Sequence, residues 1–231
     1  MSDTASDDRI VRQEHVTGGA PYYKKDFWSK ENLKYLPAHY RMRKAARLIN
    51  RLAGGRECTL LDVGCGPATL GTLLTPRIAY FGIDIAIRDP APNLREVDFL
   101  ETPIGFADRQ FDFVVAQGVF EYVGEHQERK FAEVAELLAD GGLFIASYVN
   151  FDHRARDIYW PYSNVQSLND FRTSLATHFS VRKCVPTSHN WGHSEPRRKL
   201  ISVPNMYLNV NLPIISRILA VEYFFICSRR T

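Results

Sequence analysis

The pattern of apolar and polar positions along the chain predicts strands that alternate with helices. Short apolar runs, each bounded by polar or glycine-containing stretches, lie near residues 58–63, 79–84, 94–98, 111–116 and 142–149. Runs of this length are typical of strands buried on both faces of a parallel sheet. Two later apolar runs, Phe179–Val185 and Val221–Ser228, predict two more strands. The whole pattern predicts an α/β fold, whose ligands bind at the carboxyl ends of the strands.

Helical spacing of apolar residues occurs in two places. Residues 38–52 carry apolar side chains on one helical face, and the pair Gly54 and Gly55 follows where a helix would end. Residues 128–139 repeat this spacing between two predicted strands. We therefore expect one helix before the first strand and a crossover helix between the fourth and fifth strands.

The stretch Thr59–Leu70 holds the most informative motif. An apolar run ends in Asp62, and the turn Gly64–Gly66 follows before apolar residues resume, which predicts a strand, a glycine turn and then a helix. The next apolar run ends in Asp84, 18 residues after Gly66. Two carboxylates at strand ends beside a glycine turn predict a site for a nucleoside with free ribose hydroxyls.

Two ligand classes compete for this site. A dinucleotide-binding turn has a third glycine, where this chain has Thr69, and it places a pyrophosphate at a helix N-terminus. Asp62 would face that pyrophosphate, and a carboxylate disfavours a polyanion but favours a cation. S-adenosylmethionine carries a sulfonium and an ammonium group, so the charge of Asp62 favours it over a nicotinamide dinucleotide.

Several motifs follow one another in order between residues 57 and 150: LLDVGCGPATL, FGIDIA, Val97–Phe99, the segment beginning FDFVVAQG, and LLADGGLFI. Together they resemble the motifs of the class I S-adenosylmethionine-dependent methyltransferases. The resemblance implies a Rossmann-like, mostly parallel sheet with helices on both faces. Its seven strands have the order 3-2-1-4-5-7-6 with the last strand antiparallel, and a single methyltransferase domain is expected over residues 21–231.

The resemblance also implies which residues bind the cofactor, S-adenosyl-L-methionine. Asp84 corresponds to the acid that binds both ribose hydroxyls, and Asp98 to the acid that accepts from the adenine amine. Many relatives carry a histidine where this chain has Tyr122, which is a candidate catalytic residue. The full set of expected cofactor ligands is Asp62, Gly64, Cys65, Gly66, Asp84, Ile85, Asp98, Phe99 and Gln117.

Two segments, residues 150–167 and 187–211, break the alternation of strands and helices. Long aromatic loops inside a compact domain are usually functional, so we expect these insertions to recognise the methyl acceptor. His153 follows the fifth predicted strand and is a candidate general base. The expected acceptor-binding residues are Trp160, Tyr162, His189, Trp191 and His193. The histidines among them lack a third ligand at suitable spacing, so no metal site is predicted.

The region before the first strand divides into two parts. Residues 21–55 are expected to form a helical lid over the cofactor, since they begin with a segment that includes Tyr22, Tyr23 and Trp28. Residues 1–20 are polar, predict a mobile tail, and lack the basic start and apolar core of a signal peptide. No apolar run reaches the ~20 residues of a membrane span. We therefore expect a cytoplasmic protein with no membrane contact.

The composition narrows the class of acceptor. The chain has 231 residues, 45% of them apolar, and a net charge of only +3, which does not predict a nucleic-acid partner. An Asn-Pro-Pro-Tyr motif for a flipped base is also absent. We expect a methyltransferase acting on an oxygen or nitrogen of a small-molecule metabolite, such as a sugar or a natural-product intermediate. The alternatives are an RNA or protein methyltransferase and a non-catalytic cofactor-binding relative, and the sequence leaves the oligomeric state open.

Overall fold

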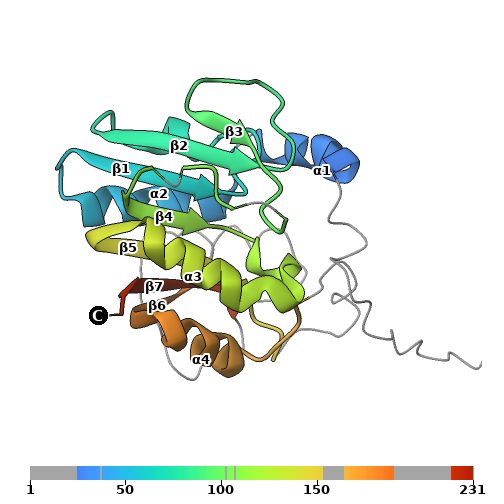
Figure 1. The fold of residues 1–231 in the computed structure, drawn as a ribbon, viewed down its shortest axis with the longest axis vertical. Coiled ribbons are helices and arrows are strands. Elements are labelled where there is room, and N and C mark those ends of the chain that lie inside the picture. Colours follow the sequence, from blue (N-terminus) through green and yellow to red (C-terminus); the bar gives the residue numbers. More distant parts are fainter. Residues whose placement is uncertain are drawn as a thin grey trace, which may run out of the picture.

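The computed structural model describes residues 25–36, 38–101, 103–106, 108–152, 164–189 and 220–230. They contain a seven-stranded sheet in the order β3-β2-β1-β4-β5-β7-β6 (Figure 1). Its strands are β1 (Cys58–Val63), β2 (Ile78–Asp84), β3 (Leu94–Glu96), β4 (Phe111–Ala116), β5 (Leu138–Val149), β6 (Phe179–His189) and β7 (Ala220–Arg229). Strands β1 to β5 pair in parallel, whereas β7 is antiparallel to β5 and β6. The predicted strand order and antiparallel last strand are confirmed.

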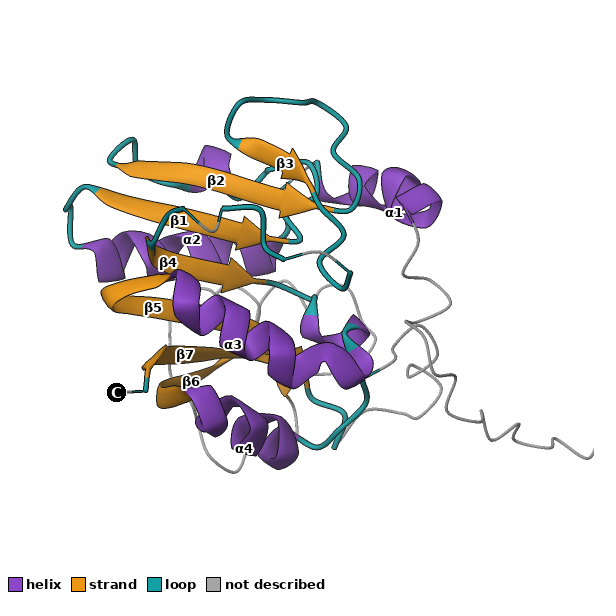
Figure 2. Cartoon of the chain, viewed as in Figure 1, coloured by secondary structure: helices purple, strands orange, loops and turns teal. Residues whose placement is uncertain are grey.

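Helices cover both faces of this sheet (Figure 2). The helices are α1 (Lys25–Glu31), α2 (Tyr40–Ala53), α3 (Gln127–Leu137) and α4 (Leu168–His178), with the 3-10 turns η1 (Asn32–Tyr35), η2 (Gly71–Leu73), η3 (Phe120–Tyr122) and η4 (Gly124–His126). Helix α2 packs on one face, where its apolar residues form a cluster with side chains of β1, β4 and β7. Helices α3 and α4 pack on the opposite face, over a second apolar cluster rich in phenylalanine. The sheet is therefore buried between two cores.

Helix α2 is the first of the two expected helices. It ends at Gly54, which adopts a left-handed conformation with φ 60° and donates its N–H to the Asn50 carbonyl. Lys44 lies on its buried face, and Nζ donates to the Pro186 carbonyl of β6 at 2.5 Å. Burial lowers the pKa of Lys44 to about 8. A buried amine thus ties α2 to the edge strand β6.

The helix expected directly after the glycine turn is not formed in the described chain. Between β1 and β2 the structure has only the 3-10 turn η2. Ala68 has a φ of 55°, which is incompatible with a right-handed helix. Pro76 then biases the residue before it toward extended backbone. The expectation was wrong because these two residues leave room for only one short turn.

Two strands are longer than the apolar pattern predicts. Strand β5 begins at Leu138, directly after α3, and β6 continues past Val185 to His189. The added positions are mostly polar or turn-forming, so the hydrophobic pattern alone did not locate these ends. No helix in the described ranges is long and apolar enough to span a membrane.

Candidate active site

A pocket opens at the carboxyl ends of the central strands, where an open α/β sheet is expected to bind its ligand. It encloses about 1010 Å³ of space, part of which is open solvent. Eight of the nine predicted cofactor ligands line it: Asp62, Gly64, Cys65, Gly66, Asp84, Ile85, Phe99 and Gln117. The lining also contains residues that were not predicted from the sequence as ligands, including Trp28, Tyr35, Arg41, Val97, Glu121 and Val149.

The glycine turn after β1 brings backbone to the pocket wall. Gly64 and Gly66 have positive φ angles of 70° and 53°. A Cβ atom added to Gly64 would lie 2.6 Å from Cγ2 of Val119, so only glycine fits there. The N–H groups of Gly64 and Cys65 both donate to the Ile83 carbonyl, at 2.9 and 3.0 Å. The turn is thereby fixed against β2.

Asp84, the last residue of β2, supports the same turn from its side chain. Its Oδ2 accepts from the Gly66 N–H at 2.8 Å, and its Oδ1 accepts from the Ala86 N–H at 3.0 Å. Each carboxylate oxygen can accept a further hydrogen bond. Asp84 is therefore held in place by backbone while it lines the pocket, as a ligand for ribose hydroxyls requires.

Asp62 is the second carboxyl group of the turn. It is buried, and its Oδ2 accepts from the Tyr80 hydroxyl at 2.8 Å. Burial, together with the nearby charge of Asp84, raises the pKa of Asp62 to about 7, although the Tyr80 hydrogen bond and Arg41 act in the opposite direction. A cationic ligand beside Asp62 would therefore favour its ionised form.

The side of the pocket near β2 and β3 is largely apolar. Ile83, Ile85, Val97 and Phe99 line it, which suits the flat face of a base. Asp98 does not appear among the lining residues, and its Oδ1 accepts from the N–H of residue 100 at 2.9 Å, which is the geometry of a turn cap. The expected adenine contact of Asp98 stays a prediction.

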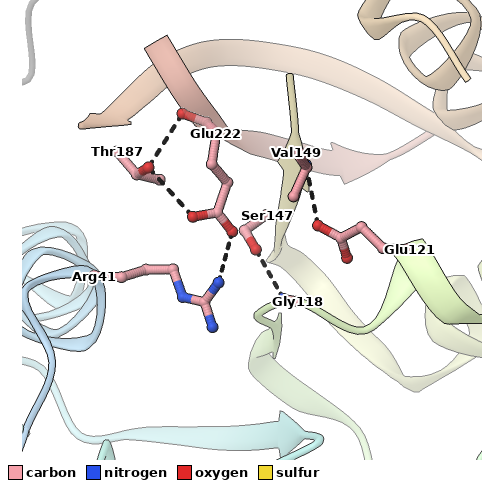
Figure 3. A network of polar contacts seen from close by, with 7 residues as sticks. All are labelled: Arg41, Gly118, Glu121, Ser147, Val149, Thr187 and Glu222. Carbon is pink, nitrogen blue, oxygen red and sulfur yellow. Dashed lines mark hydrogen bonds and ion pairs between the residues drawn. The ribbon is translucent and has the colours of Figure 1, made fainter. Parts of the chain in front are cut away.

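The opposite side of the pocket contains a buried ion pair (Figure 3). Arg41 reaches from α2 toward β7, where its guanidinium donates to Glu222 Oε1 at 2.9 Å. Burial alone would lower the pKa of Arg41, but the charge of Glu222, together with smaller contributions from Tyr35, Glu121 and Tyr40, outweighs burial and raises that pKa. The Thr187 hydroxyl of β6 donates to the other carboxylate oxygen of Glu222 at 3.3 Å. Three elements that are distant in sequence therefore meet beside the pocket.

Glu121 lines the same side and was not predicted as a site residue. It lies in η3, is fully buried, and its Oε1 accepts from the Val149 N–H at 3.0 Å (Figure 3). Burial and the charge of Glu222 raise the pKa of Glu121 to about 8. The signal in the sequence was a lone carboxylate between aromatic residues, directly before the candidate Tyr122.

Two aromatic rings complete this side of the pocket. Tyr122 and Trp28 both line it, and their rings meet edge to face with centroids 5.4 Å apart. Trp28 belongs to α1, so the described part of the predicted lid does contact the pocket. The expected role of residues 21–55 as a lid stays a prediction.

Many residues with a predicted role, as acceptor ligand, base, lid or tail, lie outside the residues that the structure describes. These are His153, Trp160, Tyr162, Trp191 and His193, together with Tyr22, Tyr23 and the tail of residues 1–20. The backbone of His189 ends β6, but its side chain is not described. No cluster of three potential metal ligands occurs among the residues that are described.

The sheet order, the glycine turn and the acids at the ends of β1 and β2 define a class I S-adenosylmethionine-dependent methyltransferase. Residues 38–185, more than half of the chain, match the family described as a methyltransferase domain. The chain belongs to this family, and S-adenosyl-L-methionine is its methyl donor. No curated protein sequence matches the chain significantly.

Solved structures of low sequence identity share the fold. One is a methyltransferase in complex with the Haloferax volcanii Trm112 activator, with 15% identity, 91% of this chain and 97% of that chain covered, and a TM-score of 0.64. Another is the N-methyltransferase NodS from Bradyrhizobium japonicum WM9 in complex with S-adenosyl-L-homocysteine. It has 15% identity and a TM-score of 0.55, and the match covers 88% of this chain and 97% of that chain. A TehB-like methyltransferase from Corynebacterium glutamicum has 16% identity and a TM-score of 0.52, and the match covers 89% of this chain and 95% of that chain.

Proposed function

We propose that this enzyme transfers a methyl group to an oxygen or nitrogen atom of a small-molecule metabolite, such as a sugar or a natural-product intermediate. The proposal is carried by the pocket side near β4 and β5, which is lined by Arg41, Glu121 and Tyr122. The described lining contains three carboxyl groups and one guanidinium, a balance that disfavours a phosphodiester chain. These features support a compact acceptor over RNA.

The pocket residues fit the charges and shape of S-adenosylmethionine, which supplies a methyl group activated by a sulfonium. Asp84 is assigned to the ribose hydroxyls, and Gly64 lines the pocket with backbone at a position where an added Cβ would meet Val119. Asp62 and Arg41 are assigned to the ammonium and carboxylate groups of the methionine part, since they offer opposite charges on one wall. Oε1 of Gln117 is buried without a hydrogen-bond partner among the described residues, so it suits a ligand donor.

Because the methyl group is already activated, the work of the chain is to orient the acceptor and to manage its proton. A hydroxyl acceptor requires a base, whereas an amine must only be neutral when it reacts. Glu121 and Tyr122 both line the pocket, which supports them as candidates for this role. His153 stays a candidate base outside the described residues.

Both insertions start at anchored residues beside this side of the pocket. Asn150, at the start of the first insertion, donates through Nδ2 to the carbonyl of Ala220, the first residue of β7, at 2.9 Å. Thr187, at the start of the second insertion, donates its hydroxyl to the Glu222 carbonyl at 3.1 Å. Asn164, near the end of the first insertion, donates its N–H to the Glu121 carbonyl at 3.0 Å and its Nδ2 to the Phe120 carbonyl at 2.8 Å. This anchoring supports the proposal that the insertions contact the acceptor.

The proposal is tested by incubating the enzyme with methyl-labelled S-adenosylmethionine and a fractionated extract of the source cells. We expect the label in a product of low molecular mass that resists both nuclease and protease. An Asp84→Asn variant serves as the control for enzyme-dependent labelling. Label recovered only in RNA or in protein would contradict the small-molecule acceptor.

A further inference from the structure

The pocket side near β5 contains a buried carboxyl group with one unused oxygen. Oε1 of Glu121 accepts from the Val149 N–H at 3.0 Å, whereas Oε2 is buried and has no hydrogen-bond partner among the described residues. A buried oxygen in this state is unfavourable unless a ligand supplies a donor. Glu121 lines the pocket, so a bound acceptor is able to supply one.

Glu121 lies across the pocket from the proposed nucleoside site. Asp84 ends β2 and Val149 ends β5, and the sheet order places β1 and β4 between these two strands. The ends of β2 and β5 are therefore three strand spacings apart, which is roughly 14 Å. If the nucleoside lies at Asp84, as the proposed function holds, Glu121 faces the acceptor instead.

Among the described residues, the charges around Glu121 leave one carboxyl group without a paired counterion. Glu121 and Glu222 are both buried, and the one described guanidinium beside them, that of Arg41, is paired with Glu222. An ionised carboxylate that is buried without a counterion is strongly destabilised. A cationic acceptor would supply the missing charge, whereas a neutral hydroxyl acceptor would not.

We infer that the acceptor is an amine, which binds as its ammonium ion to the unused oxygen of Glu121 and then transfers a proton to it. An ammonium group has only donors, so it satisfies Oε2 and adds no new acceptor. Trp28 and Tyr122, whose rings meet edge to face at 5.4 Å, line the same pocket, and aromatic rings attract cations. This inference rests on the proposed function and specifies its acceptor.

The transfer conserves protons and electrons. An N–H bond of the ammonium breaks and an O–H bond forms on Glu121, which leaves the lone pair on the amine nitrogen. That lone pair forms the new N–C bond, and the electron pair of the broken C–S bond stays on sulfur. Glu121 keeps this proton when the methylated ammonium product leaves, and it releases the proton to solvent when the next ammonium ion binds.

Three groups face Glu121 from the surrounding elements that the structure describes: Glu222 from β7, Arg41 from α2 and Tyr148 from β5. Burial and Glu222 raise the pKa of Glu121 to about 8, while Arg41 and the Val149 N–H oppose this increase. A carboxylate with a raised pKa takes a proton from an ammonium more readily than an ordinary glutamate does. Because this pKa lies above 7, Glu121 is mainly protonated in the free enzyme at pH 7.

The test is titration calorimetry on the full chain saturated with S-adenosyl-L-homocysteine, whose thioether carries no positive charge. The probes are phenethylamine and its neutral analogue 2-phenylethanol, each titrated at pH 7 in phosphate and in Tris. These buffers differ in ionisation enthalpy. The difference between the binding enthalpies measured in the two buffers therefore reports the number of protons released on binding. We expect phenethylamine to bind about tenfold or more tightly than the alcohol, as for a charge-assisted hydrogen bond. We also expect the binding of phenethylamine to release close to one proton from the enzyme, since Glu121 must ionise to receive the ammonium.

Glu121→Gln keeps an oxygen for the Val149 N–H but cannot ionise. It should lose the preference for the amine and the proton release, while its affinity for S-adenosyl-L-homocysteine stays within about threefold. Glu125→Gln, the same change at an exposed position of η4, should behave as the wild type.

Equal affinity for amine and alcohol, no amine binding at millimolar concentration, or no proton release from the wild type would each overturn the inference. Proton release that persists in Glu121→Gln would do the same. Failure of S-adenosyl-L-homocysteine to bind the wild type would instead contradict the cofactor site, so the two failures are distinguishable.

Discussion

At the scale of single residues, Gly64 shows how one backbone position shapes the pocket wall. Alanine there would need a φ near 70° and would place its Cβ 2.6 Å from Val119 Cγ2. We expect Gly64→Ala to cost about 2–4 kcal/mol of unfolding free energy, from backbone strain and overpacking together. Gly141→Ala is the matched control, because Gly141 has a φ of 75° with nothing within 4 Å of its added Cβ. Urea denaturation should show a smaller loss of about 1–2 kcal/mol in this control, and equal losses would contradict the close contact.

Asp62 gives the stability of the protein a defined pH dependence. Burial raises its pKa from an ordinary value of about 4 to about 7. Between these two values the folded state holds a proton that the unfolded state has released. Stability from this group is therefore fully present below pH 4 and is lost as the pH rises to about 7. Urea denaturation measures the free energy of unfolding across this pH range. Asp62→Asn should lose less unfolding free energy than the wild type as the pH rises, and the same pH profile in both proteins would contradict the raised pKa.

At the scale of elements, the contact between α2 and β7 depends on the ion pair of Arg41 and Glu222. Glu222→Gln leaves the buried guanidinium without its counterion, which should cost about 3–5 kcal/mol of unfolding free energy. Asp89→Asn is the matched control, since it makes the same kind of change in an exposed ion pair, where Asp89 Oδ2 lies 4.0 Å from Arg88 Nε. Denaturation should place this control within about 0.5 kcal/mol of the wild type. A cost below about 1 kcal/mol for Glu222→Gln would mean that the pair does not hold α2 to β7.

The sequence predicts the parallel strands well because each is a local apolar run, and the motif resemblance supplies their order. The prediction fails after the glycine turn, where Ala68 adopts a left-handed conformation that alanine rarely takes. It also misses the ion pair of Arg41 and Glu222, which are 181 residues apart and meet only in the folded sheet. Glu121 was missed for the same reason, since its partner Val149 lies 28 residues away.

At the scale of the whole molecule, the described lining of the pocket comes from residues outside the two proposed acceptor segments. We therefore expect alanine substitutions at Trp160, Tyr162 and Trp191 to reduce turnover while cofactor affinity stays within about threefold, roughly 0.6 kcal/mol. His153→Ala tests the remaining candidate base, whose loss should lower turnover ~10²–10⁴-fold. Kinetics on the identified acceptor and titration of S-adenosyl-L-homocysteine measure the two effects separately. Full activity in all four variants would move acceptor recognition away from the insertions.

The central claim is that the pocket at the carboxyl ends of β1, β2 and β4 binds S-adenosylmethionine through Asp84. Titration calorimetry with S-adenosyl-L-homocysteine tests it most directly, on the wild type and on Asp84→Asn, with Asp89→Asn as an exposed control. We predict saturable binding to the wild type and control, no comparable binding of NAD, and about 10–150-fold weaker binding to Asp84→Asn, since a hydrogen bond to a charged acceptor contributes ~1.5–3 kcal/mol. An unchanged dissociation constant in Asp84→Asn, or equally tight binding of NAD, would contradict the claim.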